Sequence, residues 1–251
     1  MIEFRHVTAG YGDTPVLKDI SLTIPQGSLT ALVGPNGCGK TTLLRAAVRQ
    51  LPLQSGEILL GGRSIADYER KEFARHVAFM PQVRSIPAIS VQALVSHGRF
   101  PYLGLSRRMR PEDRDAVRKA MEDTGVSEWA HRDLRALSGG ERQRVYIAMA
   151  LAQDTDIVFL DEPTTYLDLS RQFELLELIR SLRHHGKTVV IVLHDLAHAL
   201  RYSDHMILME QGRIAACGAP QELFVSGELA RVFGVQAHQA ADGFYFTPQS
   251  K

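Results

Sequence analysis

The sequence predicts an α/β fold, in which the strands of a largely parallel sheet alternate with helices. The apolar run at residues 29–33 has the pattern of a buried strand, and it breaks at once into the glycine-rich segment 34–42. Further apolar runs at residues 156–160, 188–193 and 205–209 are separated by segments with helical periodicity. Continuous apolar strands are typical of a parallel sheet covered on both faces, and right-handed crossovers join such strands.

The N-terminal segment has the pattern of antiparallel strands. Residues 2–7 and 16–24 alternate apolar with polar side chains, and the turn-rich segment 9–15 joins them. Alternation with a period of two predicts strands that bury one face and pair as a hairpin. A short strand with its turn is predicted at residues 56–62, and a buried strand at residues 76–80.

The middle of the chain has a helical pattern. From residue 90 to residue 152 apolar side chains recur mostly at helical spacing, most clearly at residues 112–124. Between residues 99 and 119 there are seven basic side chains and three acidic ones. Such a run is typical of a solvated helical face, but it would also suit contact with a partner or with anionic lipid headgroups. The sequence leaves both interpretations open.

The C-terminal part returns to the alternation of helix and strand. A helix is predicted at about residues 170–184, and another after Asp195, where an apolar strand ends. Residues 210–213, Glu-Gln-Gly-Arg, predict a hairpin turn. The last segment, 236–251, is polar, and its one weak strand pattern lies at residues 244–247.

The composition is that of a globular chain with a sizeable core. Of the 251 residues 45% are apolar, and a net charge of +1 provides no overall field that would attract nucleic acid. No run approaches the ~18 apolar residues of a membrane span, and the first residues do not resemble a signal peptide. Of the two cysteines, Cys38 and Cys217, the first lies in the glycine-rich segment, where a disulfide would distort the loop. We therefore expect reduced thiols and a cytoplasmic chain.

Segment 34–42 predicts a phosphate-binding loop. It meets the P-loop pattern at the four fixed positions, Gly34, Gly39, Lys40 and Thr41. Glycines let successive backbone N–H groups turn toward phosphate oxygens, and the helix that begins at about Lys40 directs its positive end at the same anion. Lys40 adds a full charge, and the Thr41 hydroxyl is a ligand for Mg²⁺. A chance glycine turn would not explain the strand before it and the helix after it.

Two carboxylates follow a buried strand. Residues 157–160 are apolar, and Asp161 and Glu162 come directly after them. The carboxyl ends of parallel strands form the edge at which α/β sheets bind ligands. Asp161 is therefore predicted to hold Mg²⁺, and Glu162 to act as general base on the water that attacks a phosphate. The alternative is a structural role in which both acids cap the following segment.

A histidine ends the next apolar strand. Asp195 is predicted to cap the helix that follows, which leaves His194 at the strand tip, where it could hydrogen-bond a γ-phosphate. His194 and His198 have the i, i+4 spacing of paired metal ligands. We reject a metal site there, because the residues between them, Asp-Leu-Ala, lack a catalytic acid at the expected place and no third ligand is evident.

Segment 137–143, Leu-Ser-Gly-Gly-Glu-Arg-Gln, predicts a second anion site. Ser138 can cap the helix that begins around Gly140, and Gly139 and Gly140 permit close approach of the backbone to an anion. A single nucleotide rarely needs two such sites from one chain. Two copies packed head-to-tail, each P-loop facing the other copy's Ser-Gly-Gly, would use both sites and would close with two-fold symmetry.

The motifs and their order along the chain resemble those of the ATP-binding subunits of ABC transporters. The resemblance extends from residue 2 to about residue 235. Tyr11, in the turn between the first two strands, could from its position be a packing residue or stack on a base, and the resemblance favours stacking on adenine. Segment 34–42 matches the Walker A loop, Gln82 the Q-loop, segment 137–143 the signature, segment 158–162 the Walker B strand, segment 166–168 the D-loop and His194 the switch histidine.

The resemblance implies one ABC ATPase domain over residues 1–251. Its fold would be a RecA-like P-loop core with an antiparallel β subdomain and an inserted α-helical subdomain at residues 83–152, which carries the signature. It implies catalytic roles for Glu162, His194 and Gln82, and Mg²⁺ ligands in Thr41, Gln82 and Asp161. It implies ATP binding by Tyr11, Gly34, Asn36, Gly37, Cys38, Gly39, Lys40, Thr41, Thr42, Ser138, Gly139, Gly140 and Asp168.

A narrower likeness is to the importers of iron–siderophore complexes, of which haem and cobalamin importers are close relatives. Segments 98–104, 148–155, 162–169 and 192–196 carry it. The sequence departs at residues 197–198, Ala-His, where siderophore ATPases often have Asn-Gln. The departure lies beyond the switch histidine and leaves the chemistry untouched.

The function that follows from the resemblance is ATP hydrolysis, with Mg²⁺, that drives import of a ferric siderophore. The expected partners are a second copy of the chain, two transmembrane permease subunits and, indirectly, a substrate-binding protein, with no nucleic acid. The expected location is peripheral, on the cytoplasmic face of the inner or plasma membrane. One alternative is a haem or cobalamin importer ATPase, and one from a different class is a soluble mechanochemical ATPase of the ABC type. Another is a nucleotide kinase or switch GTPase, which would leave segment 137–143 unexplained.

Overall fold

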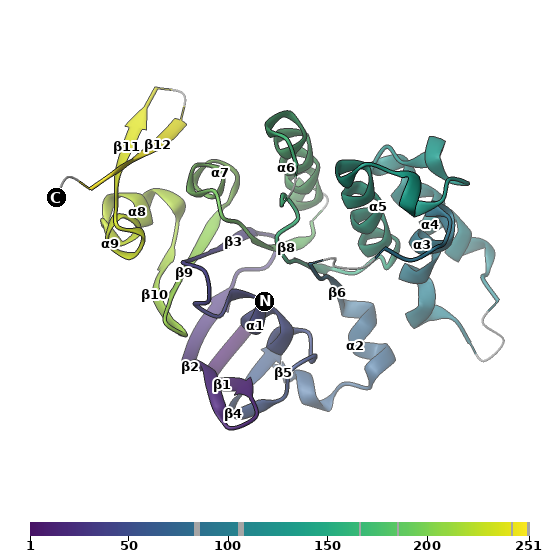
Figure 1. Ribbon diagram of the computed structural model, residues 1–251. Coiled ribbons are helices and arrows are strands. Elements are labelled where there is room, and N and C mark those ends of the chain that lie inside the picture. The colour runs from purple at the N-terminus through teal and green to yellow at the C-terminus, as the bar shows by residue number, and fades with distance from the viewer. Residues whose placement is uncertain (83–85, 105–107, 166, 185, 242, 250–251) are drawn as a thin grey trace. The chain divides into compact units, whose positions relative to one another are not determined.

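The computed structural model describes residues 1–82, 86–104, 108–165, 167–184, 186–241 and 243–249 (Figure 1). The chain divides into two compact units. The first unit comprises residues 1–68 and 188–251, and the second comprises residues 69–187. Among the described residues, no helix has both the length and the apolar character needed to cross a membrane.

The first unit contains the antiparallel sheet that the N-terminal pattern predicts. The hairpin of β1 and β2 is confirmed, but its turn is tighter than predicted, because pairing continues to Tyr11 and Thr14. The sheet has the order β2-β1-β4-β5, and a short 3-10 helix, Ile65–Asp67, follows it. The strands are β1 (Ile2–Tyr11), β2 (Thr14–Ile24), β4 (Leu53–Leu60) and β5 (Arg63–Ser64).

Parallel strands in the first unit carry the glycine-rich loop. In this part of the sheet β8 and β9 flank β3, both parallel to it, and β10 pairs antiparallel to β9. Every residue of β3 and β8 is buried, as their continuous apolar sequences predict. The elements are β3 (Leu29–Val33), α1 (Lys40–Ala47), β8 (Thr188–Val192), α7 (Leu196–Tyr202), β9 (His205–Glu210) and β10 (Arg213–Gly218).

The turn between β9 and β10 is the predicted hairpin. Glu210 and Arg213 are register partners, and the two residues between them, Gln211 and Gly212, have φ of 49° and 83°. Positive φ at both central positions is the geometry of a two-residue turn that matches the twist of antiparallel strands. The prediction of a hairpin at residues 210–213 is therefore confirmed.

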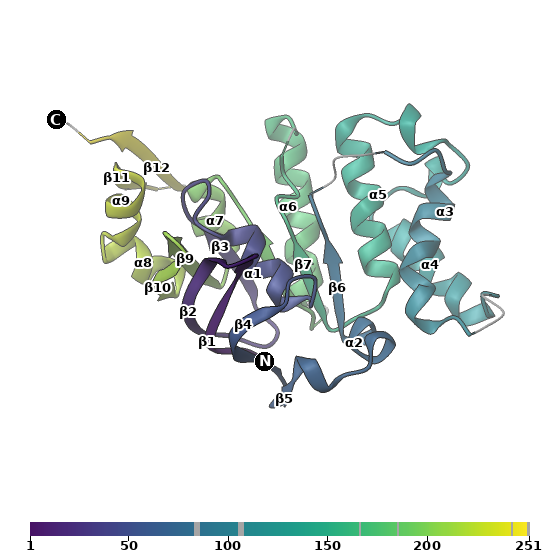
Figure 2. The same ribbon diagram turned by 60° about the horizontal axis from the view of Figure 1, so that its bottom comes forward.

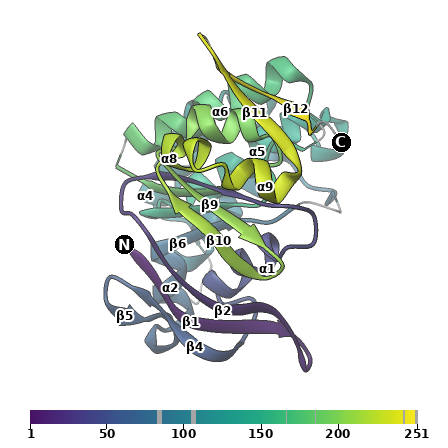
Figure 3. The same cartoon turned by 90° about the vertical axis from the view of Figure 1, so that its left-hand side faces the viewer.

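The C-terminal segment folds further than its polar sequence predicts. Residues 244–247 are extended, as expected, but they pair with a strand, at residues 235–240, that the polar sequence does not predict. The Phe244 ring packs on Phe224, with centroids 5.0 Å apart, and the His238 ring stacks on Tyr245 at 4.8 Å. Figures 1 and 3 show the resulting hairpin next to the last two helices. The elements are α8 (Pro220–Val225), α9 (Glu228–Phe233), β11 (Val235–Ala240) and β12 (Gly243–Pro248).

The second unit is mainly helical. The predicted helical pattern is confirmed, with α3 and α4 packed against α5 (Figure 2). Strands β6 and β7 run parallel, with Met80 opposite Leu160. The longer elements are α2 (Arg70–His76), β6 (Val77–Met80), α3 (Val91–Ser96), α4 (Pro111–Asp123), α5 (Gly139–Ala152), β7 (Ile157–Leu160) and α6 (Leu169–His184). The 3-10 helices are η2 (His97–Tyr102), η3 (Ser127–Trp129) and η4 (Leu134–Ala136).

One arginine of the basic run lies inside the second unit. Arg99 is buried, and its guanidinium donates to Asp113 Oδ1 at 3.0 Å and to the carbonyl oxygen of Ala152 at 2.9 Å. Burial by itself would raise the pKa of Asp113, but the backbone N–H of Arg110 and the guanidinium of Arg99 lower it below its ordinary value. Arg99 therefore belongs neither to a solvated face nor to a partner surface, because it joins η2, α4 and the end of α5.

Candidate functional site

The glycine-rich loop connects β3 to α1. Gly34 has φ of 154°, and a Cβ there would lie 2.3 Å from the carbonyl oxygen of Met209 and 2.7 Å from Sγ of Cys38. Gly39 has φ of 109° at the N-cap of α1. Glycine adopts the positive φ at both positions without strain, and at Gly34 it also leaves room for the carbonyl oxygen of Met209. Asn36 and Gly37 form the exposed tip of the loop, whereas Thr42 faces the interior.

Lys40 is the first residue of α1, as predicted, and its ammonium group lies inside the loop. Nζ donates to the carbonyl oxygens of Gly34 at 2.7 Å and Pro35 at 3.1 Å, and only 6% of the residue is exposed. A buried ammonium group is tolerated only with hydrogen-bond partners of this kind. The charge is thus fixed at the N-terminus of α1, where the helix dipole also favours an anion. Thr41 follows it and is half-buried.

Cys38 lies in the loop as a buried thiol. Only 4% of the residue is exposed, and burial raises the pKa of the thiol, although the nearby charge of Lys40 opposes the shift. Its carbonyl oxygen accepts the N–H of Gly212 at 3.0 Å. The side chain is therefore a protonated packing residue at neutral pH.

Tyr11 ends β1 with 51% of its surface exposed. Its hydroxyl accepts a hydrogen bond from Nη1 of Arg45 in α1 at 3.0 Å. An exposed ring anchored at its hydroxyl is unlike a half-buried packing residue. Of the two roles that the sequence leaves open for Tyr11, a packing residue and a ring that stacks on a base, the structure therefore disfavours the first.

His194 lies at the tip of β8, as predicted. It is exposed, and the next residue, Asp195, caps α7 by accepting the N–H of His198 at 3.0 Å. The N–H of Leu193 donates to the carbonyl oxygen of Leu32 at 3.2 Å. Since β3 and β8 are parallel neighbours, His194 leaves the same sheet edge from which the glycine-rich loop begins. His198 is buried, so the two histidines occupy different environments.

In the second unit, two side chains that follow parallel strands meet. Gln82 comes after β6, and its Nε2 donates to Oε2 of Glu162, which comes after β7, at 2.9 Å. Thr165 Oγ1 donates to the same oxygen at 3.4 Å. Glu162 has φ of 54°, a strained conformation for a residue with a side chain, and such strain concentrates at functional sites. Asp161 beside it is buried, with its N–H bonded to the carbonyl oxygen of Met80 at 3.0 Å.

Ser138 caps α5, as predicted. Its Oγ accepts the N–H of Glu141 at 3.3 Å, and Oε2 of Glu141 accepts the N–H of Ser138 at 2.7 Å. This reciprocal pair is a capping box, which the Ser-x-x-Glu spacing could have revealed. Hydrogen bonds from the backbone N–H and then from the hydroxyl of Ser138 lower the pKa of Glu141.

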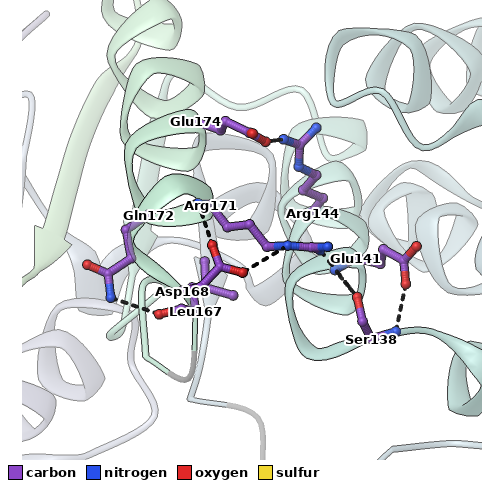
Figure 4. A network of polar contacts seen from close by, with 8 residues as sticks. All are labelled: Ser138, Glu141, Arg144, Leu167, Asp168, Arg171, Gln172 and Glu174. Atoms are coloured by element: carbon purple, nitrogen blue, oxygen red, sulfur yellow. Dashed lines mark hydrogen bonds and ion pairs between the residues drawn. The ribbon is translucent and has the colours of Figure 1, made fainter.

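Asp168 lies beside the signature segment (Figure 4). Its Oδ1 accepts the N–H of Arg171 at 2.9 Å. Tyr166, which belongs to the predicted D-loop, lies outside the described residues, as does residue 83, the first of the predicted helical insert. A hollow of about 220 Å³ is lined by Ser138, Gly139, Gly140, Leu167, Asp168 and Arg171. The structure therefore brings four of the predicted binding residues together in the second unit.

Comparison with known proteins places these motifs in context. The family model described as ABC transporter matches residues 17–165. The ferric enterobactin transport ATP-binding protein FepC of Escherichia coli is 45% identical, over 97% of this chain and 91% of FepC. The iron(3+)-hydroxamate import ATP-binding protein FhuC of Bacillus subtilis is 43% identical, over 93% of this chain and 87% of FhuC.

Solved structures with the same fold are also similar in sequence. A protein described as a metal-chelate type ABC transporter, in an inward-facing conformation, has a TM-score of 0.84 and 26% identity, over 100% of this chain and 98% of that one. A dimeric ATP-binding cassette in a post-hydrolysis state, bound to ADP and phosphate, has a TM-score of 0.76 and 26% identity, over 88% of this chain and 99% of that one. The predicted P-loop core with antiparallel sheets is confirmed.

Proposed function

This chain belongs to the ABC transporter family, and from that premise we propose that it is the ATP-hydrolysing subunit of a ferric siderophore importer. The observation that carries the proposal is its identity, 41–45% over nearly its whole length, with ATP-binding proteins for hydroxamate, enterobactin, petrobactin and achromobactin transport. Because those relatives serve different chelates, the proposal extends to the class of ferric siderophores and to no single member.

The glycine-rich loop binds the phosphates of ATP in this proposal. Lys40 and the backbone N–H groups at the start of α1 contact the β- and γ-phosphates, with Gly34, Asn36, Gly37, Cys38, Gly39 and Thr42 shaping the loop. The exposed Tyr11 ring stacks on adenine, and its hydrogen bond to Arg45 supports it. His194, on the same sheet edge as the loop, donates a hydrogen bond to the γ-phosphate.

The residues proposed as metal ligands suit Mg²⁺. They provide a hydroxyl from Thr41, an amide oxygen from Gln82 and a carboxylate from Asp161, and oxygen donors are the ones that this small, hard cation prefers. When bound, Mg²⁺ offsets negative charge on the phosphate oxygens. Asp161 is buried directly after β7, which fixes its carboxylate in place.

Glu162 is the proposed general base. Gln82 Nε2 and Thr165 Oγ1 both donate to its Oε2, which orients the carboxylate so that Oε1 can accept a proton from the attacking water. The strained backbone of Glu162 fixes the same side chain at its Cα. Because Gln82 also borders the helical segment, it could pass changes at the site to a membrane partner.

The remaining parts of the proposal concern assembly. Two copies of the chain share each ATP, with Ser138, Gly139 and Gly140 of one copy closing on the nucleotide held by the other, and Asp168 lies beside them. The helical segment predicted at residues 83–152 docks onto two transmembrane permease subunits, which receive cargo from a substrate-binding protein. The chain would therefore lie on the cytoplasmic face of the membrane without crossing it.

Growth on defined iron sources tests the cargo. A strain that lacks this chain should lose growth on ferric siderophores, keep growth on haem, and regain siderophore growth when the wild-type gene is returned. Growth on every siderophore tested, together with loss of growth on haem or of cobalamin uptake, would overturn the assignment.

Glu162→Gln tests the chemistry. We expect the variant to bind ATP and form a stable dimer while its turnover falls at least ~100-fold, the usual contribution of a general base. Phosphate release and size-exclusion chromatography with ATP give the two measurements. The matched control is Glu177→Gln, an exposed glutamate on α6, which should keep wild-type turnover. Retained turnover in Glu162→Gln would remove Glu162 from its role.

A further inference from the structure

Arg171, which the proposed mechanism does not use, lies against the signature serine (Figure 4). Its Nη1 donates to Ser138 Oγ at 3.3 Å, and its Nε lies 3.3 Å from Oδ2 of Asp168. The same side chain crosses Gly140, where a Cβ would lie 2.9 Å from both Cδ and Nη1 of Arg171. One arginine in the first turn of α6 therefore joins Asp168, Ser138 and the first turn of α5.

The hydrogen bonds of Ser138 determine what its hydroxyl can do. A serine hydroxyl has two acceptor positions and one hydrogen. The N–H of Glu141 and the guanidinium of Arg171 both donate to Ser138 Oγ, so the acceptor positions are filled. The remaining hydrogen is donated to the Glu141 carboxylate, whose pKa it helps to lower, until a phosphate oxygen takes that place. The hydroxyl is therefore fixed as a donor, which is what a phosphate oxygen requires.

The start of α5 needs such a donor more than the start of α1 does. In α1 the N-cap residue is Gly39, and no side chain caps the helix. In α5 the capping box already binds the N–H groups of Ser138 and Glu141. The cap of α5 thus takes up a backbone donor at the signature, and side-chain groups must contribute more there.

The ion pair of Arg171 is suited to a contact that forms and breaks. The side chains of Arg171 and Asp168 are 46% and 65% exposed. Ion pairs this exposed contribute little to stability, because water and salt screen them. The guanidinium can therefore adjust when a phosphate arrives, without a large cost to the fold.

We propose that Arg171 is a positioning residue for ATP-driven dimerisation. By donating to Ser138 Oγ it directs the hydroxyl hydrogen toward the γ-phosphate of the ATP that the second copy holds, and it connects this contact to Asp168. The inference rests on the proposed function, in which the signature segment closes on that nucleotide.

A double-mutant cycle between Arg171 and Ser138 tests the proposal. Arg171→Gln, Ser138→Ala and the double variant are made in the Glu162→Gln background, and the ATP concentration for half-maximal dimerisation is measured by analytical ultracentrifugation. We expect Arg171→Gln to raise it about tenfold when Ser138 is present, and less than about twofold in Ser138→Ala. Arg171→Lys, which keeps the charge, should recover part of the loss.

Arg144→Gln is the matched control, since Arg144 of α5 pairs with Glu174 of α6 and joins the same two helices without contacting Ser138. It should leave dimerisation unchanged. An equal effect of Arg171→Gln with and without Ser138, or an equal effect of Arg144→Gln, would overturn the positioning role. If the Glu162→Gln parent binds ATP but never dimerises, the shared-site mechanism of the proposed function fails. If the parent dimerises and Arg171→Gln does not change the ATP concentration required, only the positioning role of Arg171 fails.

Discussion

The chain has two helix N-termini that the sequence predicts to bind phosphate, and they are built in opposite ways. At α1 the cation, Lys40, is 6% exposed, the loop is confined by glycines, and no side chain caps the helix. At α5 the nearby cation, Arg171, has 46% of its side chain exposed, and Ser138 with Glu141 caps the helix. The first arrangement suits an anion that is held firmly. The second suits an anion that is bound and released reversibly, as a dimer that opens and closes would require.

Lys40→Ala should have the largest effect in this comparison. It removes the buried charge from the loop, so we expect ATP binding by the single subunit to be lost and kcat/KM to fall at least ~100-fold. Fluorescent-nucleotide binding and phosphate release measure the two effects. Lys18→Ala, an exposed lysine on β2, is the control and should behave as wild type. Normal nucleotide binding in Lys40→Ala would contradict the P-loop role.

Ser138→Ala should give a different pattern. We expect turnover to fall about tenfold, while the affinity of the single subunit for ATP stays at the wild-type value, because Ser138 acts only on the other copy's nucleotide. The same two assays separate these quantities. A matching loss of nucleotide affinity in the single subunit would show that Ser138 serves its own chain's site.

The glycines should differ in their effect on stability. In Gly34→Ala the new Cβ meets backbone atoms of Met209, so we expect a loss of about 2–4 kcal/mol in the free energy of unfolding. In Gly140→Ala the nearest atoms belong to side chains, the flexible Arg171 at 2.9 Å and Leu167 at 3.4 Å, so the loss should stay below ~1 kcal/mol. Urea denaturation measures both values. Equal losses would mean that the two loops are equally confined.

Thiol reactivity should show the smallest effect. Cys217 is exposed, whereas Cys38 is buried and its pKa is raised. Because the thiolate is the reactive form, iodoacetamide should label Cys217 first, and labelling of Cys38 should become fast only at a higher pH than for an ordinary exposed thiol. Mass spectrometry after timed labelling distinguishes the two residues. Equal rates at neutral pH would show that the loop opens readily.

Local pattern predicted much of this structure. The continuous apolar strands, the helix start at Lys40 and the caps Ser138 and Asp195 depend on neighbouring residues, and they were predicted. The sequence does not predict strand β11, because the strand is stabilised by pairing with β12, whose Phe244 packs on α8, and a polar sequence carries no sign of that contact.

Contacts between distant residues account for the rest. Arg99 belongs to a basic run, yet it is buried. Its burial is tolerated because the guanidinium donates hydrogen bonds to Asp113 and to the carbonyl oxygen of Ala152. The bond from Gln82 to Glu162 spans 80 residues. Each motif could be recognised by itself, but the hydrogen bonds that connect motifs depend on the fold.

Mixed dimers test most directly the claim that two chains share each ATP. A Lys40→Ala subunit is paired with a Ser138→Ala subunit, both in the Glu162→Gln background, and the ATP trapped per isolated mixed dimer is counted. One of the two sites would then have both defects and the other would have none, so we expect one tightly held ATP. Two sites with one defect each, seen as the same ATP content as a mixture of the two parent dimers, would contradict the shared site.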